Sequence, residues 1–259
     1  MPPYRFSAEV VGRAAREALA AGAGEVCAVF HRSFYLRLNG RYACIGDGSL
    51  GRGPLNALVP AFDAPPLGAT ALVSLESARS WAPPPAHGNA RPNLEALRAC
   101  LDGHVPEEGL GCVILGVDNA LSVHAQPALE ALGRWLAGNA LGLEAAQLIG
   151  LGPGLTPSGD DYLGGVLVAL RWVGRGAHAD SLWRWLEPRL SARTSAISAA
   201  HLAAAARGEV HEVLHDLLTD LAAWETPDLL PHLSRLDALG HTSGWDTLAG
   251  IVAVAKTSQ

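Results

Sequence analysis

Gly150-Leu151-Gly152-Pro153-Gly154-Leu155-Thr156-Pro157-Ser158-Gly159-Asp160-Asp161 is the stretch that organises this chain of 259 residues. Its four glycines and two prolines lead directly into the apolar segment 162–173, which predicts a loop followed by a buried helix. Ser158 is the predicted N-cap, and Asp160 and Asp161 fall in the first turn, where carboxylates complement the positive end of the helix dipole. Glycines let backbone N–H groups approach a ligand, and helix N-termini attract anions. The stretch is therefore either a capped turn or an anion-binding loop.

A second copy of this pattern occurs near the end of the sequence, in Gly240-His241-Thr242-Ser243-Gly244-Trp245-Asp246 and the apolar residues that follow. The two copies share Ser-Gly-x-Asp-x-Leu-x-Gly at an offset of 85 residues (243 − 158 = 85). Gly165 and Gly250 are equivalent glycines one turn farther along, and residues without a side chain let helices approach closely. We expect two equivalent helix N-termini to converge on one site.

Composition limits the classes of partner. Hydrophobic residues make up 49% of the chain and charged residues 17%, which indicates a compact globular protein. A formal net charge of −6 argues against nucleic acid as a partner, and no apolar segment is long enough to predict a membrane span. The four cysteines form no C-x-x-C pair, so free thiols in a reducing, cytoplasmic setting are expected.

The order of the elements predicts an α+β fold, with a β-rich N-terminal half and an all-helical C-terminal half. A helix at 7–21, capped by Ser7, is expected to precede the strands, and Asn39-Gly40 indicates a hairpin turn. The predicted strands are 25–30, 34–38, 42–45, 57–62, 69–75 and 111–117. The predicted helices are 93–101, 127–140, 159–173, 180–190, 194–206, 210–224, 229–239 and 245–255. The expected domains are 1–120 and 121–259, with one continuous fold as the alternative.

Two further stretches are candidate anion sites. The loop Gly51-Arg52-Gly53-Pro54-Leu55-Asn56 is either an anion loop with Arg52 as the counter-charge or a surface connection. Arg193-Thr194-Ser195 opens a predicted helix, so Thr194 or Ser195 either caps that helix or, with Arg193, binds a carboxylate or phosphate. Ser198 and His201 lie one turn apart on the same helix, where a packed histidine is the commoner arrangement.

Two metal sites are considered. His211-Glu212-Val213-Leu214-His215 matches the H-E-x-x-H signature of zinc proteases, but downstream only His232 or His241 offers a third ligand. An ordinary amphipathic helix with Val210, Val213, Leu214, Leu217 and Leu221 on its buried face is the favoured interpretation. Asp160, Asp161 and Asp246 are candidate ligands for Mg²⁺, and capping and dipole complementation are the alternative.

The stretch 152–161 closely resembles the signature of a bacterial family whose named member is a subunit of oxamate carbamoyltransferase, an enzyme of allantoin breakdown. The similarity extends to the loop 51–56, the helix start 194–198 and the segment 240–246. This resemblance implies carbamoyl transfer between oxalurate and phosphate, in a complex with other subunits. Non-catalytic binding of a small anion or nucleotide is the alternative function, and a zinc hydrolase is a third.

The resemblance and the residues together suggest roles for the two loops. Glycine-rich helix ends and an arginine suit small ligands with planar amide, carboxylate or phosphate groups. His241, Asp160 and Asp161 are the candidate catalytic groups, with His241 as the proton-transfer group. Asp160, Asp161 and Asp246 are assigned to metal or amide binding. The predicted substrate or phosphate contacts are Gly152, Gly154, Thr156, Ser158, Gly159, Arg193, Thr194, Ser195, Thr242, Ser243 and Gly244.

Overall fold

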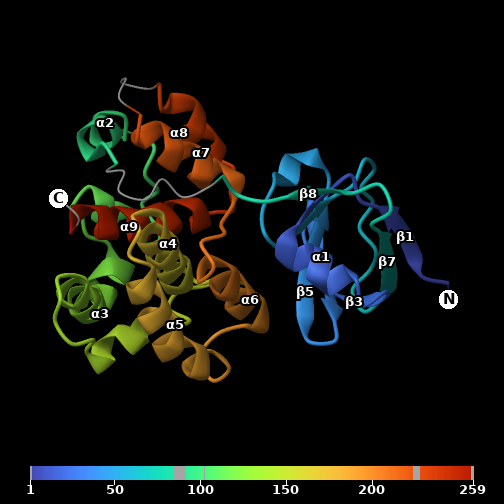
Figure 1. Cartoon of the computed structure of the whole chain (residues 1–259), viewed down its shortest axis with the longest axis horizontal. Coiled ribbons are helices and arrows are strands. Elements are labelled where there is room, and N and C mark those ends of the chain that lie inside the picture. The colour runs from blue at the N-terminus through green and yellow to red at the C-terminus, as the bar shows by residue number, and fades with distance from the viewer. Residues whose placement is uncertain (1, 85–91, 102, 224–227, 258–259) are drawn as a thin grey trace. The chain divides into compact units, whose positions relative to one another are not determined.

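The computed structural model describes residues 2–84, 92–101, 103–223 and 228–257 (Figure 1). The chain forms two compact units. The first comprises Met1–Pro84 together with Glu209–Glu212, and the second comprises Pro85–Gly208 and Val213–Gln259. The predicted boundary near residue 120 falls within the second unit, where it coincides with the start of a helix.

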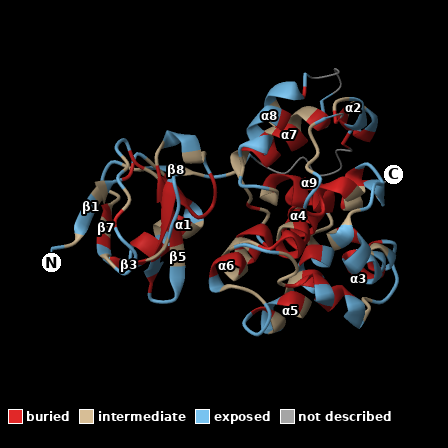
Figure 2. Cartoon of the chain, turned by 180° about the vertical axis from the view of Figure 1, so that it is seen from behind, coloured by how far each residue is buried: buried red, intermediate tan, exposed pale blue. Residues whose placement is uncertain are grey.

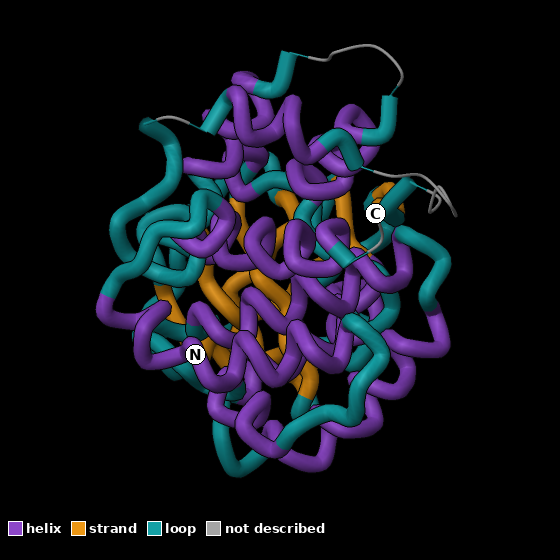
Figure 3. Tube along the Cα trace, turned by 90° about the vertical axis from the view of Figure 1, so that its left-hand side faces the viewer, coloured by secondary structure: helices purple, strands orange, loops and turns teal. Residues whose placement is uncertain are grey.

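The first unit contains an eight-stranded sheet with the order β1-β7-β3-β4-β5-β6-β2-β8. The strands are β1 (Tyr4–Ser7), β2 (Val10–Gly12), β3 (Gly24–Val29), β4 (Ser33–Leu38), β5 (Arg41–Gly46), β6 (Asn56–Leu58), β7 (Thr70–Ser74) and β8 (Arg79–Trp81). Figure 3 distinguishes these strands from the helices. The predicted α+β class, with a β-rich N-terminal half and a helical C-terminal half, is confirmed.

The sheet closes on itself through the bent segment 4–12. Its first part, β1, pairs in parallel with β7, and its second part, β2, pairs with β6 and β8. Between them, the Ala8 N–H donates to the Ser74 carbonyl and the Glu9 N–H to the Leu58 carbonyl. The predicted helix at 7–21 and its Ser7 cap are therefore wrong, since only α1 (Arg13–Leu19) is helical. The strand pairing depends on residues that are distant in sequence, and this pairing overrides local helix propensity.

The core of the first unit lies between α1 and the curved sheet. Phe34 on β4 is fully buried, and its ring stacks against Phe62 with ring centroids 6.0 Å apart. Ala15, Ala18 and Leu19 of α1 join the same hydrophobic cluster. The predicted hairpin turn is confirmed, because Asn39 and Gly40 both have positive φ between β4 and β5.

All the long helices belong to the second unit. Its helical elements are α2 (Leu94–Ala99), η2 (Gly111–Ile114), α3 (Ala120–Leu136), η3 (Leu143–Leu148), α4 (Ser158–Trp172), α5 (Gly176–Leu190), α6 (Ala196–Ala205), α7 (Glu212–Leu221), α8 (Leu230–Asp237) and α9 (Ser243–Lys256). The predicted strand 111–117 is wrong, because this short apolar run forms the 3₁₀ helix η2. The predicted end of α7 at residue 224 lies outside the described residues. None of the described helices combines the length and apolar character required to cross a bilayer.

Helix α4 is the centre of the second unit and packs most extensively against α9 (Figure 2). The two equivalent glycines produce this close packing. A Cβ atom on Gly165 would lie 1.9 Å from the Thr247 carbonyl oxygen, and one on Gly250 would lie 2.0 Å from the Tyr162 carbonyl oxygen. Thr247 and Tyr162 are themselves equivalent in the repeat (247 − 162 = 85). The two copies therefore pack against each other symmetrically, as the repeat predicts.

Candidate functional site

The N-termini of α4 and α9 lie side by side. The Thr156 hydroxyl, in the loop before α4, is 3.1 Å from the Ser243 hydroxyl at the start of α9. We call this region the paired N-termini: the loop and first turn at 150–161, together with the first turn at 242–246. The convergence expected from the repeat is therefore present in the structure.

Asp160 fixes the loop before α4 from inside the protein. The side chain is 2% exposed, and its Oδ1 accepts the Gly150 N–H at 2.8 Å. Its Oδ2 accepts hydrogen bonds from the hydroxyls of Thr194 and Ser198. Each oxygen thus has a donor within the fold, and these contacts join the loop to the start of α6. Asp160 therefore has a clear structural role at the position proposed for catalysis or metal binding.

Asp246 plays a comparable structural role at α9. It is fully buried, and its Oδ1 accepts the N–H groups of Leu110 and Gly111 at 2.5 and 3.1 Å. Its Oδ2 accepts the Thr242 hydroxyl at 2.8 Å. Burial raises the pKa of Asp246, while the hydroxyls of Ser158 and Thr242 and the two backbone N–H groups oppose that rise.

Asp161 is equivalent to Asp246 in the repeat, but its surroundings differ. Within the described part of the chain, its Oδ2 is buried and has no hydrogen-bond partner. Burial raises the pKa of Asp161 well above its usual value, and the negative charges of Asp246 and Asp160 add to the rise. The hydroxyls of Ser243 and Thr156 oppose it. Asp161 is thus the one carboxyl of the three with an unsatisfied oxygen.

The hydroxyl contacts cross between the two copies. The Ser243 hydroxyl of α9 hydrogen-bonds to the Asp161 carboxyl of α4 and lowers its pKa. In the same way, the Ser158 hydroxyl of α4 hydrogen-bonds to the Asp246 carboxyl of α9. Ser158 is the first residue of α4 rather than its cap, since Pro157 occupies the cap position without a side-chain hydrogen bond. The predicted capping role of Ser158 is therefore wrong. Its side chain instead helps to hold the neighbouring helix.

The backbone donors of these first turns are largely used within the fold. The Gly159 N–H donates to the Leu151 carbonyl at 2.9 Å, and the N–H groups of Asp160 and Asp161 both donate to the Pro157 carbonyl. In α9, the Asp246 N–H donates to the Thr242 carbonyl. These donors are the groups that a phosphate would use at a helix N-terminus.

Ser195 and the candidate glycines shape the two loops. Ser195 caps α6, as one of the two sequence interpretations states, and its hydroxyl also donates to the Leu155 carbonyl at 2.8 Å. Gly152 and Gly154 have positive φ, which suits glycine in the tight turns before α4. Gly244 lies so close to Leu236 that a Cβ atom would be 2.8 Å from its Cδ1.

Two charged residues predicted for the site, Arg193 and His241, contact other parts of the protein. Arg193 is exposed, and its guanidinium donates to the Ala146 carbonyl at 3.2 Å. The side chain of His241 is 81% exposed and pairs with Glu108 at 2.7 Å. His201 is partly buried on α6. The structure therefore brings together the hydroxyls and carboxyls of the predicted site, but not its predicted cation or its predicted proton-transfer group.

Binding of Mg²⁺ by the three carboxyls stays a prediction, and two of these carboxyls are already hydrogen-bonded within the fold. Mg²⁺ requires a nearly octahedral set of oxygen ligands, whereas Asp160 and Asp246 direct their oxygens toward N–H and hydroxyl donors. Among the described residues, no group of three or more His, Cys, Asp or Glu side chains is arranged to hold a metal ion.

Sequence reasoning missed the contribution of residues 109–111. Leu110 and Gly111 donate to Asp246, and a Cβ atom on Gly109 would lie 2.5 Å from its Oδ1. These residues lie 135 or more positions away from Asp246 along the chain. The only signal was the pair of glycines around Leu110, because glycine permits such a close approach.

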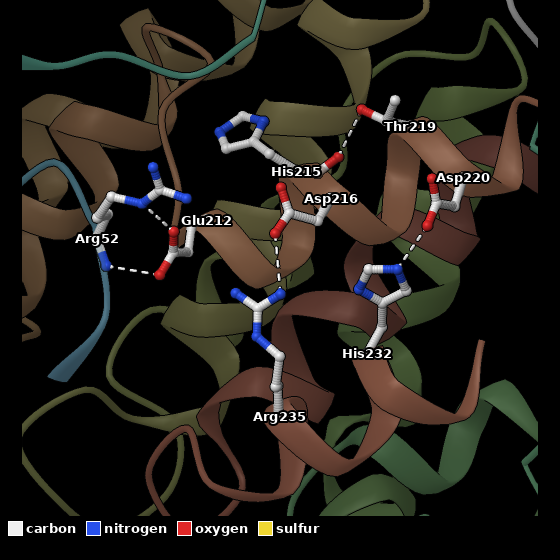
Figure 4. Close-up of polar contacts among 8 residues, drawn as sticks. All are labelled: Arg52, Glu212, His215, Asp216, Thr219, Asp220, His232 and Arg235. Carbon is white, nitrogen blue, oxygen red and sulfur yellow. Dashed lines mark hydrogen bonds and ion pairs between the residues drawn. The ribbon is translucent and has the colours of Figure 1, made fainter. Parts of the chain in front are cut away.

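The H-E-x-x-H stretch spans both compact units, and its glutamate serves a structural role in the first. The Arg52 backbone N–H donates to Glu212 at 3.0 Å, and the Arg52 guanidinium forms an ion pair with the same carboxylate (Figure 4). His211 precedes α7, and its Nε2 lies 3.0 Å from the Leu50 carbonyl oxygen. Arg52 thus holds the segment 209–212 in the first unit, and the predicted anion is replaced by Glu212.

The rest of α7 is an ordinary amphipathic helix, as predicted, but Val210, which is predicted on its buried face, precedes the helix and is only partly buried. Val213, Leu214, Leu217 and Leu221 are buried. Its polar face forms ion pairs with α8, where Asp216 meets Arg235 at 2.9 Å and Asp220 meets His232 at 2.6 Å (Figure 4). His232, one of the two histidines considered as a third zinc ligand, is therefore paired with a carboxylate.

Gly51 gives a test of this docking within the first unit. It has a φ of +72°, and a Cβ atom there would lie 2.5 Å from His211 Nε2. We expect Gly51→Ala to destabilise the first unit by about 1–3 kcal/mol because it combines backbone strain with a clash. Gly48→Ala is the matched control, since no atom lies within 4 Å of its Cβ position. Equal thermal midpoints for the two variants would contradict the proposed docking role.

Comparison with known proteins concerns the part of the chain that carries both copies of the repeat. No solved structure matches the chain. Residues 148–255 match the model of the family described as oxamate carbamoyltransferase subunit AllH. The match confirms the resemblance predicted from the sequence, and the part of the chain that is similar to that family, residues 148–255, includes α4, α6 and α9.

Proposed function

We propose that this chain is a subunit of a carbamoyltransferase and that the paired N-termini bind its small amide- or carboxylate-bearing ligand. The family match supports the type of enzyme. The observation that carries the proposed site is the buried Asp161 Oδ2 atom, which has no hydrogen-bond partner among the described residues and lies where two equivalent helix starts meet. Buried polar atoms are nearly always hydrogen-bonded, so an unpaired one beside a family signature is a candidate ligand contact.

In the proposed reaction, the carbamoyl group moves from the amide nitrogen of oxalurate to a phosphate oxygen. The carbon–nitrogen bond breaks as the carbon–oxygen bond forms, and the oxamate nitrogen takes up the proton that phosphate releases. The hydroxyls of Thr156 and Ser243 are the proposed positioning groups for the planar ligand, because both lie beside Asp161. Further subunits of the complex are proposed to supply the cationic and proton-transfer groups.

Ligand-induced stabilisation tests this proposal. We expect oxamate, oxalurate or carbamoyl phosphate to raise the thermal midpoint, since a ligand at a hundredfold excess over its dissociation constant adds about 2.7 kcal/mol of stability. Each titration is performed with and without Mg²⁺, so that an ion carried by the ligand's phosphate is detected. Ser243→Ala should reduce the shift because it removes a hydroxyl from the site. Ser234→Ala, at an exposed position on α8, should leave it unchanged.

Two outcomes would count against the proposal. A shift that persists in full in Ser243→Ala would place the binding elsewhere on the chain. The absence of a shift with all three compounds would contradict ligand binding at the paired N-termini. Turnover separates an enzyme subunit from a non-catalytic binding module, and it is measured as carbamoyl phosphate formed from oxalurate and phosphate with the other subunits present.

A further inference from the structure

The paired N-termini bring carboxyl groups together, and several of their backbone N–H groups already have acceptors within the fold. Asp160, Asp161 and Asp246 bring three carboxyl groups to one place, and Asp161 Oδ2 is buried with no partner in the part of the chain that the structure describes. The N–H groups of Gly159, Asp160, Asp161 and Asp246 already donate to carbonyl oxygens of the protein. An incoming phosphate or carboxylate would compete with those carbonyls for its hydrogen bonds.

The local charge favours the same kind of ligand group. Burial raises the pKa of Asp161, and the negative charges of Asp246 and Asp160 add to that rise, so these two carboxylates contribute a negative potential at Asp161. A second anionic group placed against Asp161 would be repelled by that potential. A neutral NH₂ group with its partial positive charge would be attracted, and it would satisfy the unpaired oxygen.

We infer that the paired N-termini bind the amide end of the ligand, with Asp161 Oδ2 accepting a hydrogen bond from its NH₂ group. The inference rests on the proposed function, and it adds which end of the ligand lies at the paired N-termini. The carboxylate of oxamate, or the phosphate of carbamoyl phosphate, then points away from the three carboxyls. The hydroxyl of Ser243 holds the Asp161 carboxyl in place beside the ligand.

Matched pairs of ligands test this inference by isothermal titration calorimetry. Carbamoyl phosphate and acetyl phosphate differ by NH₂ against CH₃ at equal charge, and oxamate and oxalate differ by NH₂ against an oxygen together with one more negative charge on oxalate. We expect the amide-bearing member of each pair to bind at least about tenfold more tightly, because the other leaves Asp161 Oδ2 unpaired or opposed by a second acceptor.

The Asp161→Asn variant completes the test. An asparagine side chain can present either an oxygen or an NH₂ group, so the preference within each pair should fall to within about twofold. Asp63→Asn makes the same change at an exposed carboxylate and should keep the wild-type preference. Equal binding of carbamoyl phosphate and acetyl phosphate to the wild type would overturn the inference and leave the proposed function standing. A full preference retained in Asp161→Asn would do the same, whereas no binding of any of the four compounds would overturn both.

Discussion

Replacing Gly165 by alanine is expected to destabilise the protein by about 3 kcal/mol or more, the largest effect of any single methyl group considered for the helical unit. The added Cβ atom would lie 1.9 Å from the Thr247 carbonyl oxygen, and Thr247 belongs to the backbone of α9. A backbone carbonyl inside a helix cannot rotate away, so α4 and α9 must separate. Their separation would also disturb the paired N-termini, which begin less than two turns away on both helices.

The adjacent glycine provides the control. The nearest atom to a Cβ atom on Gly164 is the Ala205 Cβ at 3.7 Å, which is an ordinary contact. Gly164→Ala is therefore expected to stabilise the protein by up to about 1 kcal/mol through higher helix propensity. Urea denaturation of both variants measures the difference. If Gly165→Ala unfolds within about 0.5 kcal/mol of Gly164→Ala, the close crossing of α4 and α9 is wrong.

The repeat explains why this part of the site was predictable from sequence. Two copies of the same short motif, each with a glycine at the same step of an apolar helix, can pack against each other at equivalent points. The contacts of Gly165 with Thr247 and of Gly250 with Tyr162 show this equivalence. The meeting of Thr156 with Ser243 then follows from the crossing of the two helices. The spacing of residues within each copy was sufficient to predict this contact, because the two copies pack against each other symmetrically.

Side-chain direction was not predictable in the same way. Arg193 and His241 both stand next to residues of the site, yet one contacts Ala146 and the other contacts Glu108. The direction of these side chains depends on which residues of other elements pack beside them, and the local sequence pattern does not determine those neighbours. Strands β1 and β2 were missed for a similar reason. Their partners are residues near 58, 71–74 and 79–81, so a helical pattern was read where long-range pairing decides the structure.

Asp161 and Asp246 occupy equivalent positions, but their replacement by asparagine is expected to have opposite effects on stability. For Asp161, the pKa in the folded state lies above the usual value of about 3.9 in the unfolded state. Between these two values the native protein binds more protons than the unfolded chain. Stability therefore falls as the pH rises through that window, at up to about 1.4 kcal/mol per pH unit. Asp161→Asn cannot ionise, so it should be more stable than the wild type above the window, by at least about 1 kcal/mol.

Asp246→Asn should instead destabilise the protein by about 2–4 kcal/mol. Burial also raises the pKa of Asp246, so removing its charge relieves the free-energy cost of burying that charge, as it does at Asp161. However, its oxygens accept hydrogen bonds from Leu110, Gly111 and Thr242, and bonds to a carboxylate contribute about 1.5–3 kcal/mol each. An amide NH₂ group in place of Oδ2 cannot accept from the Thr242 hydroxyl, and a neutral amide oxygen accepts more weakly than a carboxylate from the N–H groups of Leu110 and Gly111. The free energy lost with these hydrogen bonds is larger than the free energy gained by no longer burying a charge.

Thermal denaturation of the wild type and both variants at a series of pH values above the usual aspartate pKa separates these effects. The stability difference between Asp161→Asn and the wild type should grow as the pH rises and then level off. Parallel curves would mean that Asp161 is ionised in the native state and already has its partners, which removes the basis for assigning it to a ligand. If Asp161→Asn stabilises the protein and Asp246→Asn destabilises it, then Asp246 stabilises the fold, whereas Asp161 does not and is available to bind a ligand.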